Sequence, residues 1–214
     1  MESGSGIMVS EINLKVSDEV EQKIKAYPLF TERPLDEPSF RKRIVVGRGV
    51  WDGNSKAVDF LILGEAPGFY ENDNENGEPF IGKAGGVLDN WIKTAKLESY
   101  YISNAVPLIP LKKFQGEVLR KIRRPYAQEI RDFKLFRDYV IEKVQPRRII
   151  LLGDTACAAV LNRKTRDVIN SVARSEKQAI TGIYHPARYI RKGQDGMIQG
   201  LKDFKRAVDL LQGL

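Results

Sequence analysis

Short, largely apolar runs alternate with segments of helical periodicity along most of this 214-residue chain. The continuous runs predict buried strands, and the segments with apolar residues three and four apart predict amphipathic helices. The predicted strands are Val58–Leu63, Tyr100–Ala105, Arg148–Gly153 and Ala179–Tyr184, with Ile44–Gly49 as a candidate edge strand. The predicted helices are Gly86–Lys96, Glu129–Val144, a short helix capped by Asp154 and ending at Leu161, and Leu201–Leu211. This alternation predicts an α/β fold with a mostly parallel sheet covered on both faces.

The composition is that of one globular domain with a positive charge. The chain has 42% hydrophobic residues, 35 basic and 28 acidic residues, and a net charge of +7. Residues 1–7 are interpreted as a tag or disordered leader, and 8–214 as a single domain. The positive charge favours a polyanionic partner such as nucleic acid. No apolar run is long enough for a membrane span, and the single cysteine, Cys157, excludes an internal disulfide framework.

A glycine-rich segment follows the first predicted strand, where α/β folds bind ligands. It reads Gly64-Glu65-Ala66-Pro67-Gly68, then Glu71, then Gly77-Glu78-Pro79-Phe80-Ile81-Gly82-Lys83-Ala84-Gly85. The last part also spells GxxxxGK, the frame of an NTP-binding loop. However, Ala84 offers no hydroxyl for magnesium, and the polar stretch Asn72–Asn76 precedes the frame instead of a strand. NTP binding is therefore disfavoured.

Two further motifs lie at predicted strand ends. Asn104 lies at the end of the second strand, and His185, the only histidine, follows the fourth in His185-Pro186-Ala187. Together with the glycine-rich segment, these motifs resemble the uracil-DNA glycosylase superfamily, most closely its family 4. The resemblance covers about 43–211. It implies a three-layer α/β/α fold with a central four-stranded parallel sheet, and removal of uracil from DNA to leave an abasic site.

The resemblance also implies roles for individual residues. Phe80 would stack on a base flipped out of the helix, Asn104 would read the N3/O4 edge of uracil, and His185 would stabilise the leaving uracil anion at O2. Glu71 is the candidate for positioning the attacking water, because Ala66 stands where other branches carry an aspartate. The backbone around Gly64, Glu65, Ala66 and Gly68 would line the base pocket. A surface role for either glutamate is the alternative.

Gly68 falls where some branches carry a tyrosine that excludes the methyl group of thymine, so thymine must be rejected by another group. The expected DNA contacts are Gly82, Lys83, Ala84, Gly85, Lys112, Lys113, Arg120, Lys121, Arg123, Arg124, Arg188, Arg191 and Lys192. Several of these lie in a long basic connection from Ala105 to Arg124, for which a solvated loop is the alternative. Met197 or Ile198 could enter the duplex as a wedge, or could instead begin the last helix.

The chain departs from family 4 at the positions of its iron–sulfur cluster. Leu108 and Phe133 stand where two of the four cysteine ligands are usual, and the region Asp36–Phe40 has no CxxC pair. Thiolate ligation needs the thiolates, so we expect no cluster and no other cofactor or metal. Some relatives with a long basic insert use a histidine in it to bond to DNA; none occurs here.

We therefore expect an intracellular, cytoplasmic, monomeric and monofunctional uracil-DNA glycosylase whose partner is DNA and which has no membrane contact. Two alternatives stay open. One is a glycosylase for another modified or deaminated base, and the other is a glycosylase-fold protein that binds DNA without catalysis.

Overall fold

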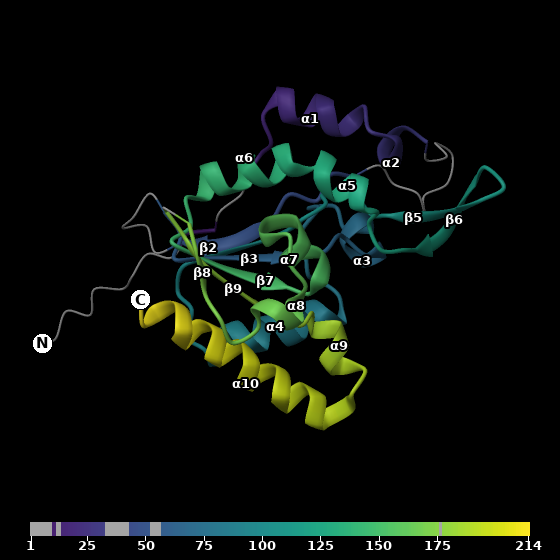
Figure 1. Cartoon of the computed structure of the whole chain (residues 1–214). Helices are drawn as coiled ribbons and strands as arrows, with labels where there is room; N and C mark the ends of the chain where they lie inside the picture. Colours follow the sequence, from purple (N-terminus) through teal and green to yellow (C-terminus); the bar gives the residue numbers. More distant parts are fainter. Residues whose placement is uncertain (1–9, 12–13, 33–42, 52–56, 176) are drawn as a thin grey trace, which may run out of the picture.

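The computed structural model describes residues 10–11, 14–32, 43–51, 57–175 and 177–214, and the expected leader 1–7 lies outside them. Within these residues one seven-stranded sheet forms the centre of the fold (Figure 1). Its order is β1 (Ser10–Glu11), β2 (Arg48–Trp51), β4 (Tyr100–Asn104), β3 (Phe60–Gly64), β7 (Arg148–Leu152), β9 (Ala179–Ile183) and β8 (Ala173–Arg174). The four central strands, β4, β3, β7 and β9, are parallel, as predicted. Strands β1, β2 and β8 add antiparallel edges, so the sheet is wider than the four predicted strands.

The central strands are apolar throughout because both faces of the sheet are buried. In β3, Leu61 and Leu63 pack in one core cluster, whereas Phe60 and Ile62 pack in the other. Successive side chains of a strand point to opposite faces, so one continuous apolar run supplies two cores.

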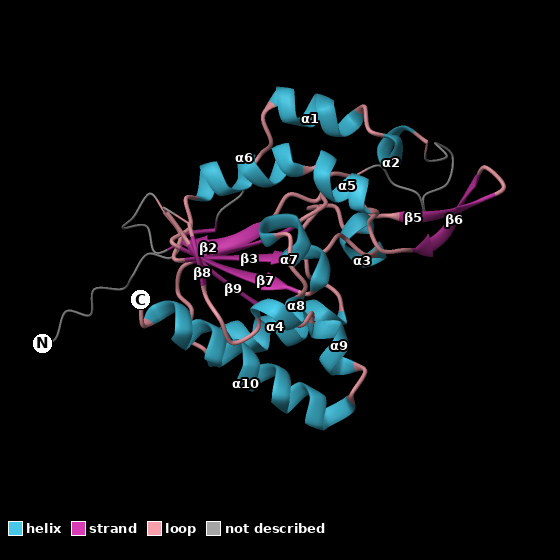
Figure 2. Cartoon of the chain, viewed as in Figure 1, coloured by secondary structure: helices cyan, strands magenta, loops and turns pink. Residues whose placement is uncertain are grey.

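Helices cover both faces of the sheet and complete the predicted three-layer α/β/α fold (Figure 2). One core is closed by α1 (Asp18–Lys25), α6 (Lys134–Val144), α7 (Asp154–Leu161) and α8 (Thr165–Val168). The other is closed by α4 (Lys83–Thr94), α9 (Pro186–Ile190) and α10 (Gly193–Gln212). The short helices α2 (Pro28–Thr31), α3 (Phe69–Asp73) and α5 (Ala127–Asp132) lie toward one end of the molecule (Figure 1).

Three helix predictions need correction. The helix expected at Glu129–Val144 is two helices, α5 and α6, which are separated at Phe133. The N-cap of α7 is Gly153, whose φ of 89° favours glycine, while Asp154 is the first helical residue. The last helix begins at Gly193, so Met197 and Ile198 lie on a helix and not in a loop.

The long basic connection is a β-hairpin formed by β5 (Leu111–Phe114) and β6 (Glu117–Ile122). It protrudes from one end of the molecule in Figure 1, beside α3. An ion pair holds its base: the Arg123 guanidinium lies 2.5 and 2.7 Å from the two carboxylate oxygens of Glu129 in α5. Both side chains are nearly buried, with exposed fractions of 12% and 8%. The Arg123 Nε–H also donates to the Leu111 carbonyl (3.0 Å), which closes the hairpin.

None of the described helices is both long and apolar enough to cross a membrane.

Arg123→Met should lower the free energy of unfolding by about 3 kcal/mol, because it leaves the Glu129 carboxylate buried without its partner. The double variant Arg123→Met/Glu129→Leu should recover much of this loss. Urea unfolding measures both. Arg124→Met, at the exposed neighbouring position, is the matched control and should change stability by less than about 0.5 kcal/mol. A loss for Arg123→Met as small as that of the control would show that the ion pair does not anchor the hairpin.

Candidate active site

The ends of the parallel strands bring the predicted site residues to one edge of the sheet. Gly64 ends β3 and pairs in register with Asn104, which ends β4. The N–H of Ala105 donates to the Gly64 carbonyl at 2.9 Å, so the pairing continues past these residues. His185 follows β9, and Gly153 follows β7 beside it. A β-carbon at Gly153 would lie 3.1 Å from that of His185.

Phe80 and Asn104 pack against the bare backbone of Gly64. A β-carbon at Gly64 would lie 2.6 Å from Asn104 Oδ1 and closer still to the Phe80 ring, and both distances are too short for non-bonded atoms. The Phe80 ring also stacks on His185, with centroids 5.6 Å apart and planes 29° apart. The structure thus brings Gly64, Phe80, Asn104 and His185 into one connected cluster.

The backbone of Phe80 is strained and is held in place by neighbours. Its φ of 57° is unusual for a bulky residue, and such outliers concentrate at functional sites. Arg48 of β2 donates to the carbonyls of Pro79 (2.9 Å) and Phe80 (3.2 Å). On the other side, Gly85 lies so close to the Phe80 carbonyl that a β-carbon there would overlap it. Arg48 and Gly85 together hold the backbone of Phe80 in this conformation.

Asn104 presents an amide to this cluster. Its exposed fraction is 2%, and its Oδ1 lies beside the backbone of Gly64. A side-chain amide carries both a donor and an acceptor, so this group suits a ligand that offers one of each.

His185 is held as a neutral imidazole. It is the N-cap of α9, and its Nδ1 accepts the N–H of Ala187 at 3.2 Å. The proton of the neutral ring therefore sits on Nε2. Burial, and secondarily the positive charge of Arg191, lowers the pKa of His185 to about 4. The side chain can therefore donate a hydrogen bond at neutral pH without carrying a charge.

The two glutamates have different partners. Glu65 accepts a hydrogen bond from Thr155 Oγ1 (2.5 Å) and so ties the end of β3 to α7, which is compatible with a supporting role in the pocket. The Oε2 of Glu71 accepts the N–H of Gly68 (3.0 Å) at the start of α3, and a β-carbon at Gly82 would lie 3.9 Å from its Oε1. A β-carbon at Gly68 would meet Glu71 and, at 3.9 Å, Ile122 of the hairpin. Ala66 is half-buried near the first core.

The expected DNA contacts fall into two groups around this edge. Gly82 is the N-cap of α4, followed by Lys83, Ala84 and Gly85 in its first turn. The second group consists of exposed basic side chains on the hairpin, the following connection, and α9 with its end: Lys112, Lys113, Arg120, Lys121, Arg124, Arg188, Arg191 and Lys192. Lys113 pairs with Glu32, and Arg188 lies 3.9 Å from the centre of the Tyr184 ring. Arg123 does not belong with them, because Glu129 and two backbone carbonyls occupy its guanidinium.

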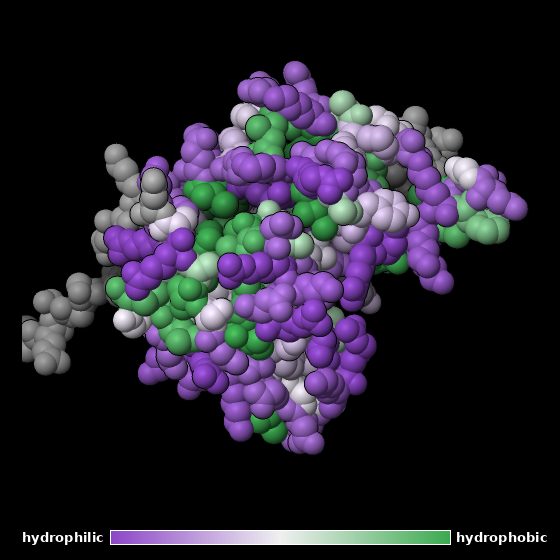
Figure 3. All heavy atoms as spheres, viewed as in Figure 1, coloured by the Kyte–Doolittle hydropathy of each residue, from purple (hydrophilic) through white to green (hydrophobic). Residues whose placement is uncertain are grey.

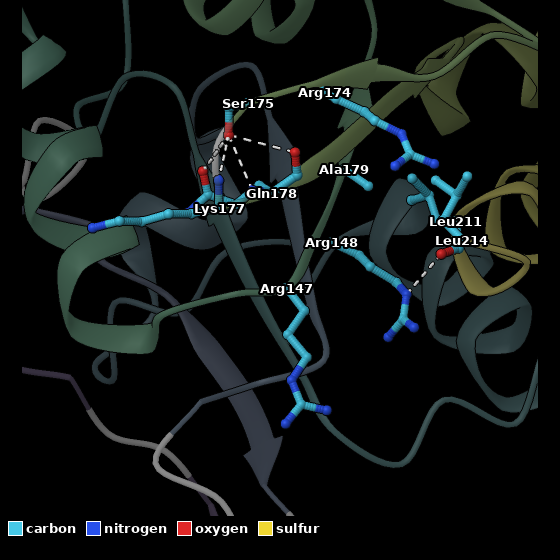
Figure 4. A pocket seen from close by; sticks show the side chains of 9 residues that line it. All are labelled: Arg147, Arg148, Arg174, Ser175, Lys177, Gln178, Ala179, Leu211 and Leu214. Carbon is cyan, nitrogen blue, oxygen red and sulfur yellow. Dashed lines mark hydrogen bonds between the residues drawn. The ribbon is translucent and has the colours of Figure 1, made fainter.

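A second basic cluster lies away from the site. A cavity of about 220 Å³ is lined by Arg147, Arg148, Arg174 and Lys177, beside Leu211 and Leu214 (Figure 4). It lies at the amino ends of β7 and β9, whereas the candidate site lies at their carboxyl ends. Arg148 is held there by the Leu211 carbonyl at 2.8 Å.

The residues do not fit a four-cysteine cluster. The only cysteine of the sequence, Cys157, is buried in α7, and burial raises the pKa of its thiol to about 11. Leu108 and Phe133 are core residues of the first cluster. In the described part of the chain, no three His, Cys, Asp or Glu side chains are grouped to hold a metal ion. Asp36–Phe40 lies outside the described residues.

Sequence reasoning missed two residues that position the site, Arg48 and Thr155. The signal for Arg48 was an arginine within the candidate edge strand Ile44–Gly49, but an exposed edge strand commonly carries one. Thr155 has no signal in a single sequence, because its partner Glu65 is 90 residues away.

Comparison with known proteins shows the family of the chain. The model of the uracil DNA glycosylase superfamily matches residues 50–212. A type-4 uracil-DNA glycosylase of Saccharolobus solfataricus is 36% identical over 117 residues, 53% of this chain and 47% of that protein. The type-4 uracil-DNA glycosylase of Sulfurisphaera tokodaii is 28% identical over 69% of this chain and 66% of its own length. That of Thermotoga maritima is 25% identical over 80% of this chain and 85% of its own length. The alignments with the first two thus span about half and two thirds of those relatives.

The NMR signals of the single histidine should titrate with a midpoint near pH 4 in the folded protein and near 6.5 in urea. The unfolded chain then binds the proton more tightly than the folded chain, so stability should fall as pH drops from about 6.5 to 4. Two-dimensional spectra of tag-free, labelled protein provide the measurement. A folded-state midpoint close to 6.5 would show that the imidazole is not desolvated.

Proposed function

Because the chain belongs to the uracil-DNA glycosylase superfamily, we propose that it hydrolyses the N-glycosidic bond of deoxyuridine in DNA and leaves an abasic site. The observation that carries this proposal is the cluster in which Phe80, Asn104 and His185 meet over Gly64. It combines an aromatic face, a side-chain amide and a neutral donor, which are the groups needed to hold and release a flipped pyrimidine.

In the proposed reaction, the bond between uracil N1 and the sugar C1′ breaks and its electron pair leaves with the base. The Nε2–H of His185 donates to uracil O2 as negative charge develops there. A neutral donor that is already in position needs no reorganisation during the reaction. Asn104 binds N3–H and O4, and cytosine presents the opposite pattern at this edge. Water, oriented by the Glu71 carboxylate, adds to C1′, and the proton that it loses neutralises the uracil anion, so that the base leaves as uracil.

The phosphates of the DNA would meet two kinds of positive potential around the pocket. The first turn of α4 presents backbone N–H groups that have no partner within the helix, and helix N-termini bind phosphate. The exposed basic side chains of the hairpin and of α9 add charge on either side. This arrangement supports a DNA partner, and a DNA-repair role implies a location with the DNA of the cell. We further propose that the protein works without an iron–sulfur cluster, because its sequence has one cysteine in place of four.

Incubation with a labelled oligonucleotide that carries one uracil, followed by alkali, tests the activity. Wild-type protein should yield a break at uracil and none at thymine. His185→Ala should slow excision by about 10²–10³-fold, the effect of removing one donor to a developing anion. Its DNA affinity, measured by fluorescence anisotropy, should stay nearly unchanged. A collapse of affinity would make the histidine structural. Binding without cleavage in the wild type would favour another base or a non-catalytic role.

Gly64→Ala should reduce excision by about 10²-fold, because the added methyl group displaces both Phe80 and Asn104. Gly86→Ala in α4 is the matched control, since a β-carbon there meets no atom within 4 Å. The control should keep full activity and gain about 0.5–1 kcal/mol of stability. Equal activity of the two variants would argue that the Gly64 contacts do not shape the base pocket.

A further inference from the structure

A groove between α3 and β6 lies next to the candidate base pocket. It is lined by Phe69, Tyr70, Asp73, Asn74 and Arg120, and we call it the α3–β6 groove. Its volume is about 610 Å³, within the range of about 300–1,000 Å³ that is typical of ligand pockets. Of these residues, only Arg120 has been given a role above, as an expected DNA contact.

Two contacts make the groove continuous with the pocket. The Tyr70 ring lies against Gly82, the N-cap of α4, where a β-carbon would be 3.4 Å from Tyr70 Cδ2. At its other side, Ile122 at the end of β6 approaches Gly68. Gly82 is two residues from Phe80, and Gly68 lies in the glycine-rich segment after β3. A strand that delivers a base to Phe80 therefore passes the mouth of the groove.

The groove combines aromatic faces with positive charge. Tyr70 is 73% exposed, the highest value among the large hydrophobic side chains of the described residues. The Arg120 guanidinium lies 4.9 Å from the centre of the Phe69 ring and 3.5 Å from Asp73, so one acidic group is already paired. Lys112 and Lys121 are exposed on the same hairpin. In Figure 3 the protruding hairpin shows apolar and hydrophilic atoms side by side.

Exposed aromatic rings beside basic side chains are the arrangement by which proteins bind single-stranded nucleic acid. A base offers its face to a ring only when it is unstacked, which excludes the interior bases of an intact duplex. We propose that the α3–β6 groove binds single-stranded DNA beside the flipped nucleotide, with one base on Tyr70 and a phosphate near Arg120. The inference rests on the proposed function and narrows its substrate to DNA that is single-stranded around the target base.

An oligonucleotide without uracil tests the groove separately from catalysis. Fluorescence anisotropy should show that the wild type binds the single strand more tightly than the duplex of the same sequence. Tyr70→Ala should weaken binding to the single strand by about 5- to 100-fold, the loss of one stacked base. Its affinity for the duplex should change by less than about twofold, because the groove contacts no interior base of a duplex. Tyr70→Phe keeps the ring and should bind the single strand as the wild type does.

Two further variants separate stacking from charge and from loosening of the hairpin. Arg120→Gln should reduce the slope of log affinity against log salt by about 0.7, the value for one phosphate contact on a single strand. Tyr126→Ala removes another exposed tyrosine, one whose ring packs 3.7 Å from the Arg123 guanidinium at the base of the hairpin. It should leave the affinity for single strands unchanged.

The failures of the two proposals are distinguishable. The groove proposal is overturned if Tyr70→Ala binds single strands as tightly as the wild type does. It is also overturned if the variant loses affinity for duplex and for single strands equally, even when uracil is excised. A wild type that excises no uracil, but whose single-strand binding depends on Tyr70, overturns the enzymatic function and leaves the groove in place.

Discussion

The parallel register of the four central strands is the constraint on which the candidate site depends. Because β3, β4, β7 and β9 run in the same direction, the residues that follow them arrive at one edge. The pairing of Gly64 with Asn104 then fixes which side chain faces which backbone. A slip of one residue would turn Asn104 to the opposite face of the sheet. The buried alternation of Leu61, Ile62 and Leu63 between two cores prevents that slip.

Behind Asn104, apolar packing and an arginine hold the chain. Arg137 is buried, with an exposed fraction of 5%, and burial lowers the pKa of its guanidinium. It donates to the carbonyls of Ala105 (3.1 Å), Ile130 (2.7 Å) and Ala159 (3.4 Å). It thus joins the end of β4 to α5 and α7. Phe133, at the junction of α5 and α6, packs on Tyr27 with ring centroids 4.7 Å apart. This region therefore has a dense packing of its own around Phe133, a position at which the resemblance to family 4 implies a cysteine ligand.

The sequence predicted the four central strands well because burial on both faces leaves them continuously apolar. It did not predict the hairpin as strands, because five of the six residues of β6 are exposed. The apolar residues of β6 also do not form a continuous run, since Arg120 and Lys121 separate Leu119 from Ile122. The edge strands β1 and β8 have two residues each, too short for any periodicity. For the site, motif residues at strand ends could be found from one sequence. The clamp by Arg48 and the burial of Arg123 depend on partners brought together by folding, so neither follows from local pattern.

If the protein acts as proposed, the neutrality of His185 has to survive DNA binding. Phosphates near the pocket favour the charged imidazolium and raise the pKa of the histidine. The pKa of His185 starts at about 4, so it must rise by about 3 units before half of the rings are charged at neutral pH. Each unit of that rise requires about 1.4 kcal/mol of interaction with the charged form. Burial lowers the pKa most, and the nearby charge of Arg191 adds to its effect. An arginine at that place can therefore serve twice: it attracts the phosphate and keeps the donor beside it uncharged.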